Sequence, residues 1–120
     1  MLLFQRRHSL DLIRKVRHID DLSTQIPDLQ PDSIISRSLY ADDQVKVILF
    51  AFAPGQELSE HTASVPAMIH ILEGEANLTV GGDSFEAHPG TWVHMQAQLP
   101  HSVYAKSPVK MLLLMFQSKK

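Results

Sequence analysis

The sequence predicts an all-β fold, and three features of the chain support this prediction. Short segments that are apolar, or that alternate apolar with polar residues, recur from residue 33 to residue 117. Glycine and proline pairs separate several of them, at Pro54-Gly55, Gly81-Gly82 and Pro89-Gly90. The Gly81-Gly82 pair between two such segments is typical of a two-residue β-hairpin turn. Regularly spaced short strands with this punctuation indicate a β-sandwich or barrel.

Strands are predicted in order along this part of the chain. They are expected at residues 33–41, 45–53, 68–72, 76–80, 83–87, 91–97, 101–105 and 109–117. The segment 45–53 is apolar on both faces apart from Lys46, which predicts burial on both faces, in a sandwich interior or at a subunit interface. Together with the spare N-terminal segment, this strand favours a homodimer.

Residues 1–32 differ from this pattern and are predicted to form an N-terminal extension, with the strands confined to a domain at residues 33–120. Five basic side chains and a single acid, Asp11, occur among the first 17 residues. A short amphipathic helix is predicted there from the helical spacing of Leu12, Ile13, Val16 and Ile19. The prolines Pro27 and Pro31 exclude a continuous helix after it, so an extended lead-in is expected.

Length and composition exclude several classes of function. The 120 residues are enough for one domain, and 44% of them are apolar while 20% are charged. A net charge of −2 gives no basic surface for nucleic acid, and no apolar run approaches the ~20 residues of a membrane helix. We therefore predict no nucleic-acid partner and no membrane partner. The chain has no cysteine, which excludes thiolate chemistry and fits the cytoplasm, where we expect the protein.

The stretch from residue 54 to residue 74 carries a spaced motif. Gly55 is followed by five residues and His61, and the stretch closes on Gly74 after Leu72 and Glu73. This spacing resembles the first motif of the cupin family, which has glycine, five residues, His-x-His, three or four residues, glutamate, six residues and glycine. Ala63 stands at the position of the family's second histidine, and Ala67 stands at the position of its glutamate.

A second stretch, residues 90–105, resembles the family's second motif. That motif has glycine, five residues, Pro-x-Gly, two residues, histidine, three residues and asparagine. Its positions are filled here by Gly90, Gln96, Gln98, His101 and Ala105. The resemblance covers residues 33–116 and implies an RmlC-like jelly roll, a double-stranded β-helix barrel of about six to eight strands. Cupins are commonly dimers, so the resemblance also implies a homodimer.

The histidines of the two motifs are the first candidates for a metal site. Residues two apart on a strand share a face, so His61 and positions 63 and 67 are expected to face the same way. The family's set of three histidines and a glutamate suits Fe, Mn, Ni, Cu or Zn. This chain retains His61 and His101 of that set, which are expected to approach each other across the barrel mouth. We expect at most a weakly held divalent transition metal (Zn, Ni, Mn or Fe) there.

Further pocket residues are predicted near these motifs. His94 is a candidate third metal ligand, and Gln96 and Tyr104 are candidate binding residues for a small-molecule ligand, together with His61 and His101. His70 has the opposite strand parity to His61, so it is expected on the other face of its sheet unless a bulge intervenes.

Three functions remain open at this point. The first is a binding cupin whose barrel pocket holds a small molecule and at most a loosely bound metal, which the two missing ligands favour. The second is a metal-dependent cupin enzyme of the dioxygenase or isomerase type, whose third ligand would come from His94, His70 or Gln96. The third is a ligand-sensing or interaction module with no metal. No catalytic residue is predicted.

Overall fold

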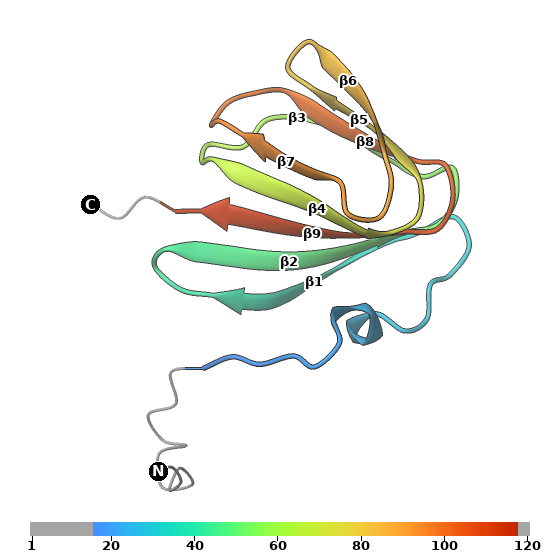
Figure 1. The fold of residues 1–120 in the computed structure, drawn as a ribbon, viewed down its shortest axis with the longest axis horizontal. Helices are drawn as coiled ribbons and strands as arrows, with labels where there is room; N and C mark the ends of the chain where they lie inside the picture. The colour runs from blue at the N-terminus through green and yellow to red at the C-terminus, as the bar shows by residue number, and fades with distance from the viewer. Residues whose placement is uncertain (1–15, 118–120) are drawn as a thin grey trace, which may run out of the picture.

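The computed structural model describes residues 16–117, and it confirms the all-β jelly roll (Figure 1). Nine strands in these residues form two antiparallel sheets that face each other. The large sheet has the strand order β1 (Ile34–Ala41), β2 (Val45–Phe52), β9 (Val109–Phe116), β4 (Ala67–Glu73) and β7 (Trp92–Met95). No helix within residues 16–117 is long and apolar enough to cross a membrane.

The small sheet supplies the second wall of the barrel. Its order is β3 (Glu57–His61), β8 (His101–Ala105), β5 (Ala76–Val80) and β6 (Asp83–Ala87). The Gly81-Gly82 hairpin joins β5 to β6, as predicted, with Val80 opposite Asp83. Strand β3 is absent from the predicted strands because Leu58 is its only apolar residue. This strand raises the count to nine, above the range that the resemblance implies.

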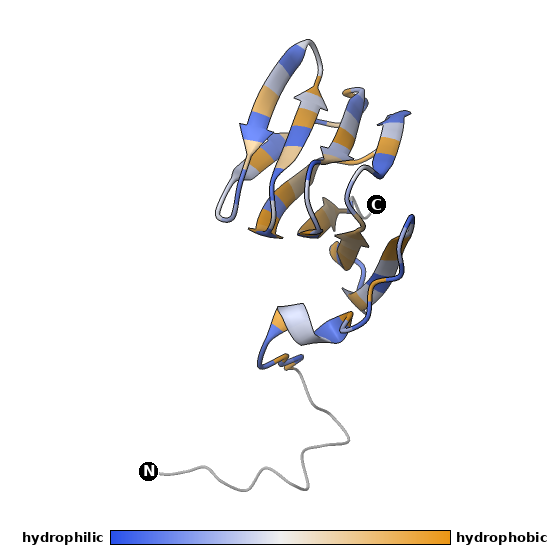
Figure 2. Cartoon of the chain, turned by 90° about the vertical axis from the view of Figure 1, so that its right-hand side faces the viewer, coloured by the Kyte–Doolittle hydropathy of each residue, from blue (hydrophilic) through white to orange (hydrophobic). Residues whose placement is uncertain are grey.

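The main core fills the space between the two sheets. Alternating residues of each strand point inward, and the alternation of hydrophobic and hydrophilic residues is visible along the strands in Figure 2. The large sheet contributes Phe52, Ile69, Ile71, Met95, Val109 and Met111, and the small sheet contributes Leu78, Val80, Val103 and Ala105. The interior of the barrel is therefore mainly apolar, and polar groups reach it only near its ends.

A second, smaller core lies on the outer face of the large sheet. There Leu39, Leu49 and Ala51 are buried together with Ile26 of the N-terminal lead-in, which we define as residues 16–30. Strand β2 is thus buried on both faces, as predicted. Because the chain's own lead-in supplies the cover, this strand no longer argues for a subunit interface, and the homodimer stays a prediction.

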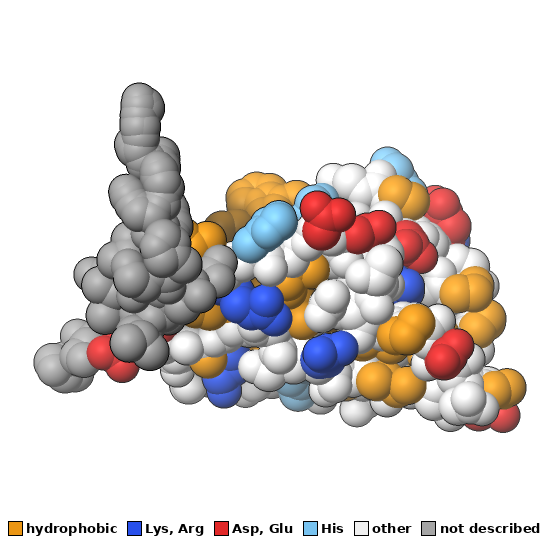
Figure 3. All heavy atoms as spheres, turned by 90° about the horizontal axis from the view of Figure 1, so that it is seen from below, with side chains coloured by type: hydrophobic (Ala, Val, Ile, Leu, Met, Phe, Trp, Pro, Cys, Tyr) orange, Lys and Arg blue, Asp and Glu red, His pale blue; other side chains and the backbone are white. Residues whose placement is uncertain are grey.

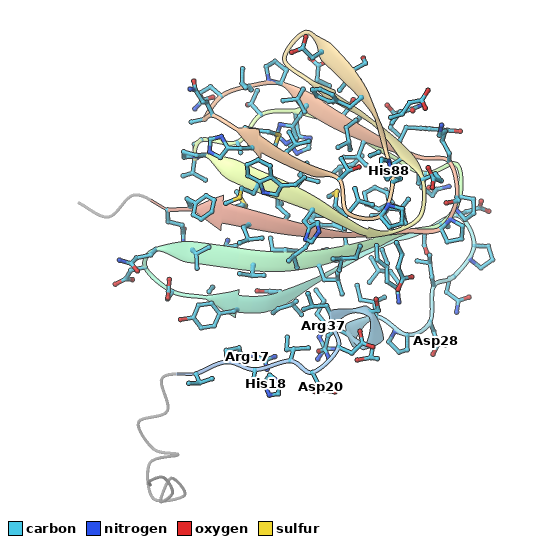
Figure 4. All side chains as sticks on the ribbon, viewed as in Figure 1. Arg17, His18, Asp20, Asp28, Arg37 and His88 are labelled. Atoms are coloured by element: carbon cyan, nitrogen blue, oxygen red, sulfur yellow. The ribbon has the colours of Figure 1, made fainter. Side chains whose placement is uncertain are left out.

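The lead-in is fixed to the sheet by hydrogen bonds as well as by packing. It contains a short 3₁₀ helix, Leu22–Gln25, whose Gln25 carbonyl accepts a hydrogen bond of 2.8 Å from the guanidinium of Arg37 on β1. Figure 4 shows Arg37 beside this helix. Lys110 of β9 donates a 2.6 Å hydrogen bond to the Ser23 carbonyl. These contacts hold the lead-in in one place along the sheet.

The amphipathic helix predicted from Leu12 to Ile19 is described only in part. Residues 16–19 are extended rather than helical, and residues 12–15 lie outside the described part of the chain. The extended path lets Ile19 pack against the second core, three residues before the 3₁₀ helix begins. Tertiary packing on the sheet has therefore overridden a weak helical pattern.

Candidate functional site

Two histidines of the small sheet lie in contact on neighbouring strands. His61 is the last residue of β3, His101 is the first residue of β8, and the two are direct cross-strand partners. Their ring centres are 4.2 Å apart, and the ring planes are inclined by 60°. His101 is buried, with 6% of its surface exposed, whereas His61 is open to solvent. The pair is thus closed on the His101 side and accessible from the His61 side.

A β-bulge in β3 creates this pairing. Leu58 pairs with Val103 and His61 pairs with His101, so three steps along β3 match two steps along β8. Without the extra residue, Glu60 would stand opposite His101. Since a shift of one residue exchanges the two faces of a strand, the bulge places an imidazole rather than a carboxylate beside His101.

Both rings are oriented in the same way by the backbone. The Nδ1 atom of His61 lies 2.8 Å from the Ser59 carbonyl oxygen, and the Nδ1 atom of His101 lies 2.9 Å from the Leu99 carbonyl oxygen. A carbonyl oxygen can only accept, so each Nδ1 carries the proton and donates it. In the neutral rings both Nε2 atoms then have a free lone pair. This is the arrangement by which proteins orient a histidine for metal or ligand binding.

The pair lies at one end of the barrel. Just beyond His61 and just before His101, the chain crosses between the sheets, through residues 62–66 and 96–100. These two connections are joined by a 2.8 Å hydrogen bond from the Gln98 amide to the Ala63 carbonyl. The large sheet reaches the same end with Ala67, which pairs with Met95 on one side and Met115 on the other. The histidines therefore lie where two connections close one end of the barrel.

The histidine pair supplies two of the four metal ligands of the family's motifs. Two imidazoles bound to one zinc at about 2.1 Å place their ring centres ~5 Å apart. The observed separation of the ring centres, 4.2 Å, is shorter than this value. Within residues 16–117, no group of three or more His, Asp or Glu side chains is arranged to hold a metal ion.

The structure does not bring the other predicted site residues to this pair. His94 lies on the outer face of the large sheet opposite Met68, because its neighbour Met95 points inward. His70 is on that outer face too, as its parity predicts, opposite Trp92 and Leu112. The prediction of His94 as a third ligand is therefore not supported by its position.

Of the two candidate ligand-binding residues, Tyr104 points away from the pair. Tyr104 is 41% exposed and alternates with the inward-facing Val103 and Ala105, so it lies on the outer face of the small sheet. Gln96 follows the end of β7 and is exposed. The alternation of buried and exposed residues along β8 places the Tyr104 side chain on the outer face. The sequence alone could not show which face of this strand is inward.

A comparison with known protein families agrees with the jelly-roll fold and with the positions of the two motifs. A model of the cupin domain matches residues 48–116, which is more than half of the chain. The chain belongs to the cupin family. No curated protein sequence matches this cupin.

Solved structures support the same assignment. A cupin superfamily protein from Desulfitobacterium hafniense is 26% identical with a TM-score of 0.73, over 78% of this cupin and 86% of that chain. A Streptococcus pyogenes protein of unknown function is 28% identical with a TM-score of 0.75, over 89% and 95% of the two chains. An RmlC-like cupin from Shewanella frigidimarina, 14% identical with a TM-score of 0.69 over 78% and 83%, shows the shared fold alone.

Proposed function

We propose that this cupin is a binding protein whose histidine pair, His61 and His101, holds a polar group of a small molecule at the barrel end. The observation that supports this proposal most strongly is the shared orientation of the two rings. Each Nδ1 is engaged by a backbone carbonyl, so each Nε2 is left available at a site that solvent reaches from one side.

The surroundings favour a ligand with one polar end and an apolar body. The Nε2 atoms can accept hydrogen bonds from a hydroxyl or amine of the ligand. Val80, the cross-strand partner of His101, belongs to the packed apolar core, so the apolar part of the ligand would lie against the edge of this core. Small-molecule sites commonly combine an apolar wall with a few polar groups that fix the orientation of the ligand.

A divalent transition metal is the second occupant that we propose for the pair. Two imidazoles bind Zn, Ni, Mn or Fe weakly, with water filling the other positions. A bound metal would supply a Lewis acid, and it would make the metal-dependent enzyme of the dioxygenase or isomerase type the alternative function. The two free Nε2 lone pairs favour this alternative over a module without metal.

Calorimetric titration with Zn²⁺ tests the pair as one site. The parent protein should bind one Zn²⁺ with a dissociation constant in the micromolar range or above. This corresponds to a binding free energy of roughly −8 kcal/mol or weaker. His61→Ala and His101→Ala should each abolish this binding. His94→Ala is the matched control, because it removes an exposed imidazole from the other sheet and should leave the binding unchanged.

Two results would contradict the metal-binding form of the proposal. One is binding that survives both single substitutions, and the other is binding that His94→Ala removes. The small-molecule form of the proposal is tested separately. A library of polar metabolites is screened by ligand-observed NMR against the parent protein and against His61→Ala. Ligands that bind the parent but not the variant support it, and an equal set of ligands for both proteins contradicts it.

A further inference from the structure

The connection that leads into His101 contains a residue in a disfavoured backbone conformation. Gln98 has a φ of +71°, which places it in the left-handed region. Among the described residues other than glycine, only Asp32 shares a positive φ, and aspartate is a residue type that tolerates it. A glutamine side chain is disfavoured there because its Cβ atom approaches the following carbonyl oxygen. Glycine would avoid this cost, so the surrounding structure has to hold Gln98 in place.

Three contacts from different parts of the barrel hold this connection. The Gln98 amide donates a 2.8 Å hydrogen bond to the Ala63 carbonyl on the facing connection. The Pro100 carbonyl accepts a 2.8 Å hydrogen bond from the Gly81 amide in the β5–β6 hairpin. Between them, the Leu99 side chain packs against the main core. Residues 98–100 are therefore fixed on both sides and cannot move independently of the barrel.

The fixed segment carries the carbonyl that orients His101. The Leu99 carbonyl oxygen lies 2.9 Å from the Nδ1 atom of His101. Leu99 precedes Pro100, and a residue before proline is restricted to extended backbone. The ring of Pro100 also fixes its own φ. The direction of the Leu99 carbonyl is therefore set mainly by the path on which the chain leaves Gln98.

The two connections at this barrel end offer no charged side chain for the same role. Proteins often hold such an imidazole with a carboxylate. Charged side chains of both signs are spread over the face of the molecule in Figure 3, but residues 62–66 and 96–100 include none. The orientation of the His101 ring therefore depends on the backbone path through residues 98–100.

We propose that Gln98 is a positioning residue of the histidine pair. Its left-handed backbone aims the Leu99 carbonyl at Nδ1 of His101, which leaves Nε2 of that ring free for a ligand. This assignment rests on the proposed binding role of the pair. It needs the backbone of Gln98 and not its exposed carboxamide. His61 is independent of it, because the Ser59 carbonyl on β3 orients that ring.

Substitutions at position 98 separate the backbone from the side chain. Gln98→Gly removes the carboxamide but favours the left-handed conformation, so the neutral His101 ring should keep the Nδ1–H tautomer. Gln98→Val also removes the carboxamide, but a β-branched side chain opposes a positive φ. In this variant, long-range ¹H–¹⁵N spectra should show an Nε2–H form of His101, while His61 keeps its Nδ1–H form. Thr62→Val, which places valine on the facing connection, should change neither ring.

Three results would overturn the proposal. The first is an unchanged His101 tautomer in Gln98→Val. The second is an Nε2–H form in Gln98→Gly as well, which would assign the effect to the carboxamide. The third is an equal change of His61 and His101 in Gln98→Val, which would show a general loosening of the barrel end. If the valine variant does not fold, Gln98→Thr gives the same comparison with another β-branched side chain.

Titration with Zn²⁺ distinguishes a failure of this proposal from a failure of the proposed function. Gln98→Val should weaken Zn²⁺ binding roughly tenfold or more, as the loss of an orienting partner commonly does. Gln98→Gly should bind Zn²⁺ as the parent does, and a tenfold loss there would again overturn the proposal. If the parent binds no Zn²⁺, the metal-binding form of the proposed function fails. The tautomer comparison then still decides the role of Gln98, because it needs no metal.

Discussion

His61 and His101 are direct cross-strand partners with ring centres 4.2 Å apart, but they differ sharply in burial. His101 belongs to the buried end of the barrel, with 6% of its surface exposed, and His61 faces solvent. The same two side chains therefore share the proposed binding role but have different structural roles. This difference separates effects on binding from effects on stability.

Alanine at the two positions should affect stability unequally. His101→Ala removes a buried ring and leaves the Leu99 carbonyl without its donor, which should lower the free energy of unfolding by about 1–3 kcal/mol. His61→Ala should cost less than ~1 kcal/mol because its ring is exposed. Urea unfolding followed by far-UV circular dichroism measures both values. Equal losses for the two variants would contradict the asymmetry.

Gly74 should tolerate no side chain. It adopts a φ of +90°, and a Cβ atom there would collide with the carbonyl oxygen of Pro108. We expect Gly74→Ala to lower the free energy of unfolding by ~3 kcal/mol or more, because the obstacle is backbone and cannot rotate away.

Gly55→Ala is the matched control for this substitution. Gly55 has a φ of +82°, but no atom lies within 4 Å of its added Cβ, so only the backbone preference is lost. That loss should be about 1–2 kcal/mol. Thermal or urea unfolding of both variants compares them. If Gly55→Ala is as harmful as Gly74→Ala, the close approach of Pro108 is not the cause.

Asp42 should make the β1–β2 hairpin sensitive to acid. The Tyr40 hydroxyl donates a 2.6 Å hydrogen bond to its carboxylate, and the Gln44 and Val45 amides donate two more. These bonds, the Tyr40 bond first, lower the pKa of Asp42 below its usual value. Because the folded pKa is the lower one, the stabilisation is present above the unfolded pKa and is lost as the pH falls through the folded pKa.

Tyr40→Phe tests this assignment. Removal of the hydroxyl should raise the pKa of Asp42 toward its usual value, although the two amide bonds should keep it below that value. Carbon-13 NMR titration of the Asp42 carboxyl measures the change. Tyr104→Phe removes a hydroxyl from the outer face of the other sheet and should leave the pKa of Asp42 unchanged. A pKa that is the same in Tyr40→Phe and the parent would show that Tyr40 is not the main cause.

Ala63→His should strengthen metal binding at the histidine pair. Ala63 follows His61 by two residues, at the place of the family's second histidine. A third imidazole there should tighten Zn²⁺ binding by roughly tenfold or more, about 1.4 kcal/mol per tenfold step. The control Thr62→His places the ring one residue away. Calorimetry should show a gain for Ala63→His alone, and an equal gain for Thr62→His would argue against a directed third ligand.

The fold could be predicted from the sequence because its signals are local. Gly81-Gly82 specifies a hairpin, and the doubly apolar segment 45–53 specifies a strand buried on both faces. What covers the second face could not be predicted, because the lead-in packs there through a few scattered residues such as Ile26. The packing of the lead-in depends on tertiary contacts, which leave no periodic pattern in the sequence.

The histidine pair was predictable from spacing, but its geometry was not. Alternation placed His61 and His101 on inward faces, yet only the bulge at Ser59 and Glu60 brings the two rings into register. They meet on neighbouring strands of one sheet rather than across the mouth between sheets. The Ser59 and Leu99 carbonyls that orient the rings are backbone groups, each two residues before its histidine, and their residue types give no sign of this role.

The most direct test of the central claim, that His61 and His101 form one site with both Nε2 atoms available, is NMR of the imidazole nitrogens during titration with Zn²⁺. Long-range ¹H–¹⁵N spectra of the neutral rings should show the Nδ1–H tautomer, with an unprotonated Nε2, for both histidines. On addition of Zn²⁺, the Nε2 signals of His61 and His101 should shift together and saturate together, while those of His70 and His94 stay in place. Shifts confined to His70 or His94, or His61 and His101 signals that respond independently or not at all, would contradict the account.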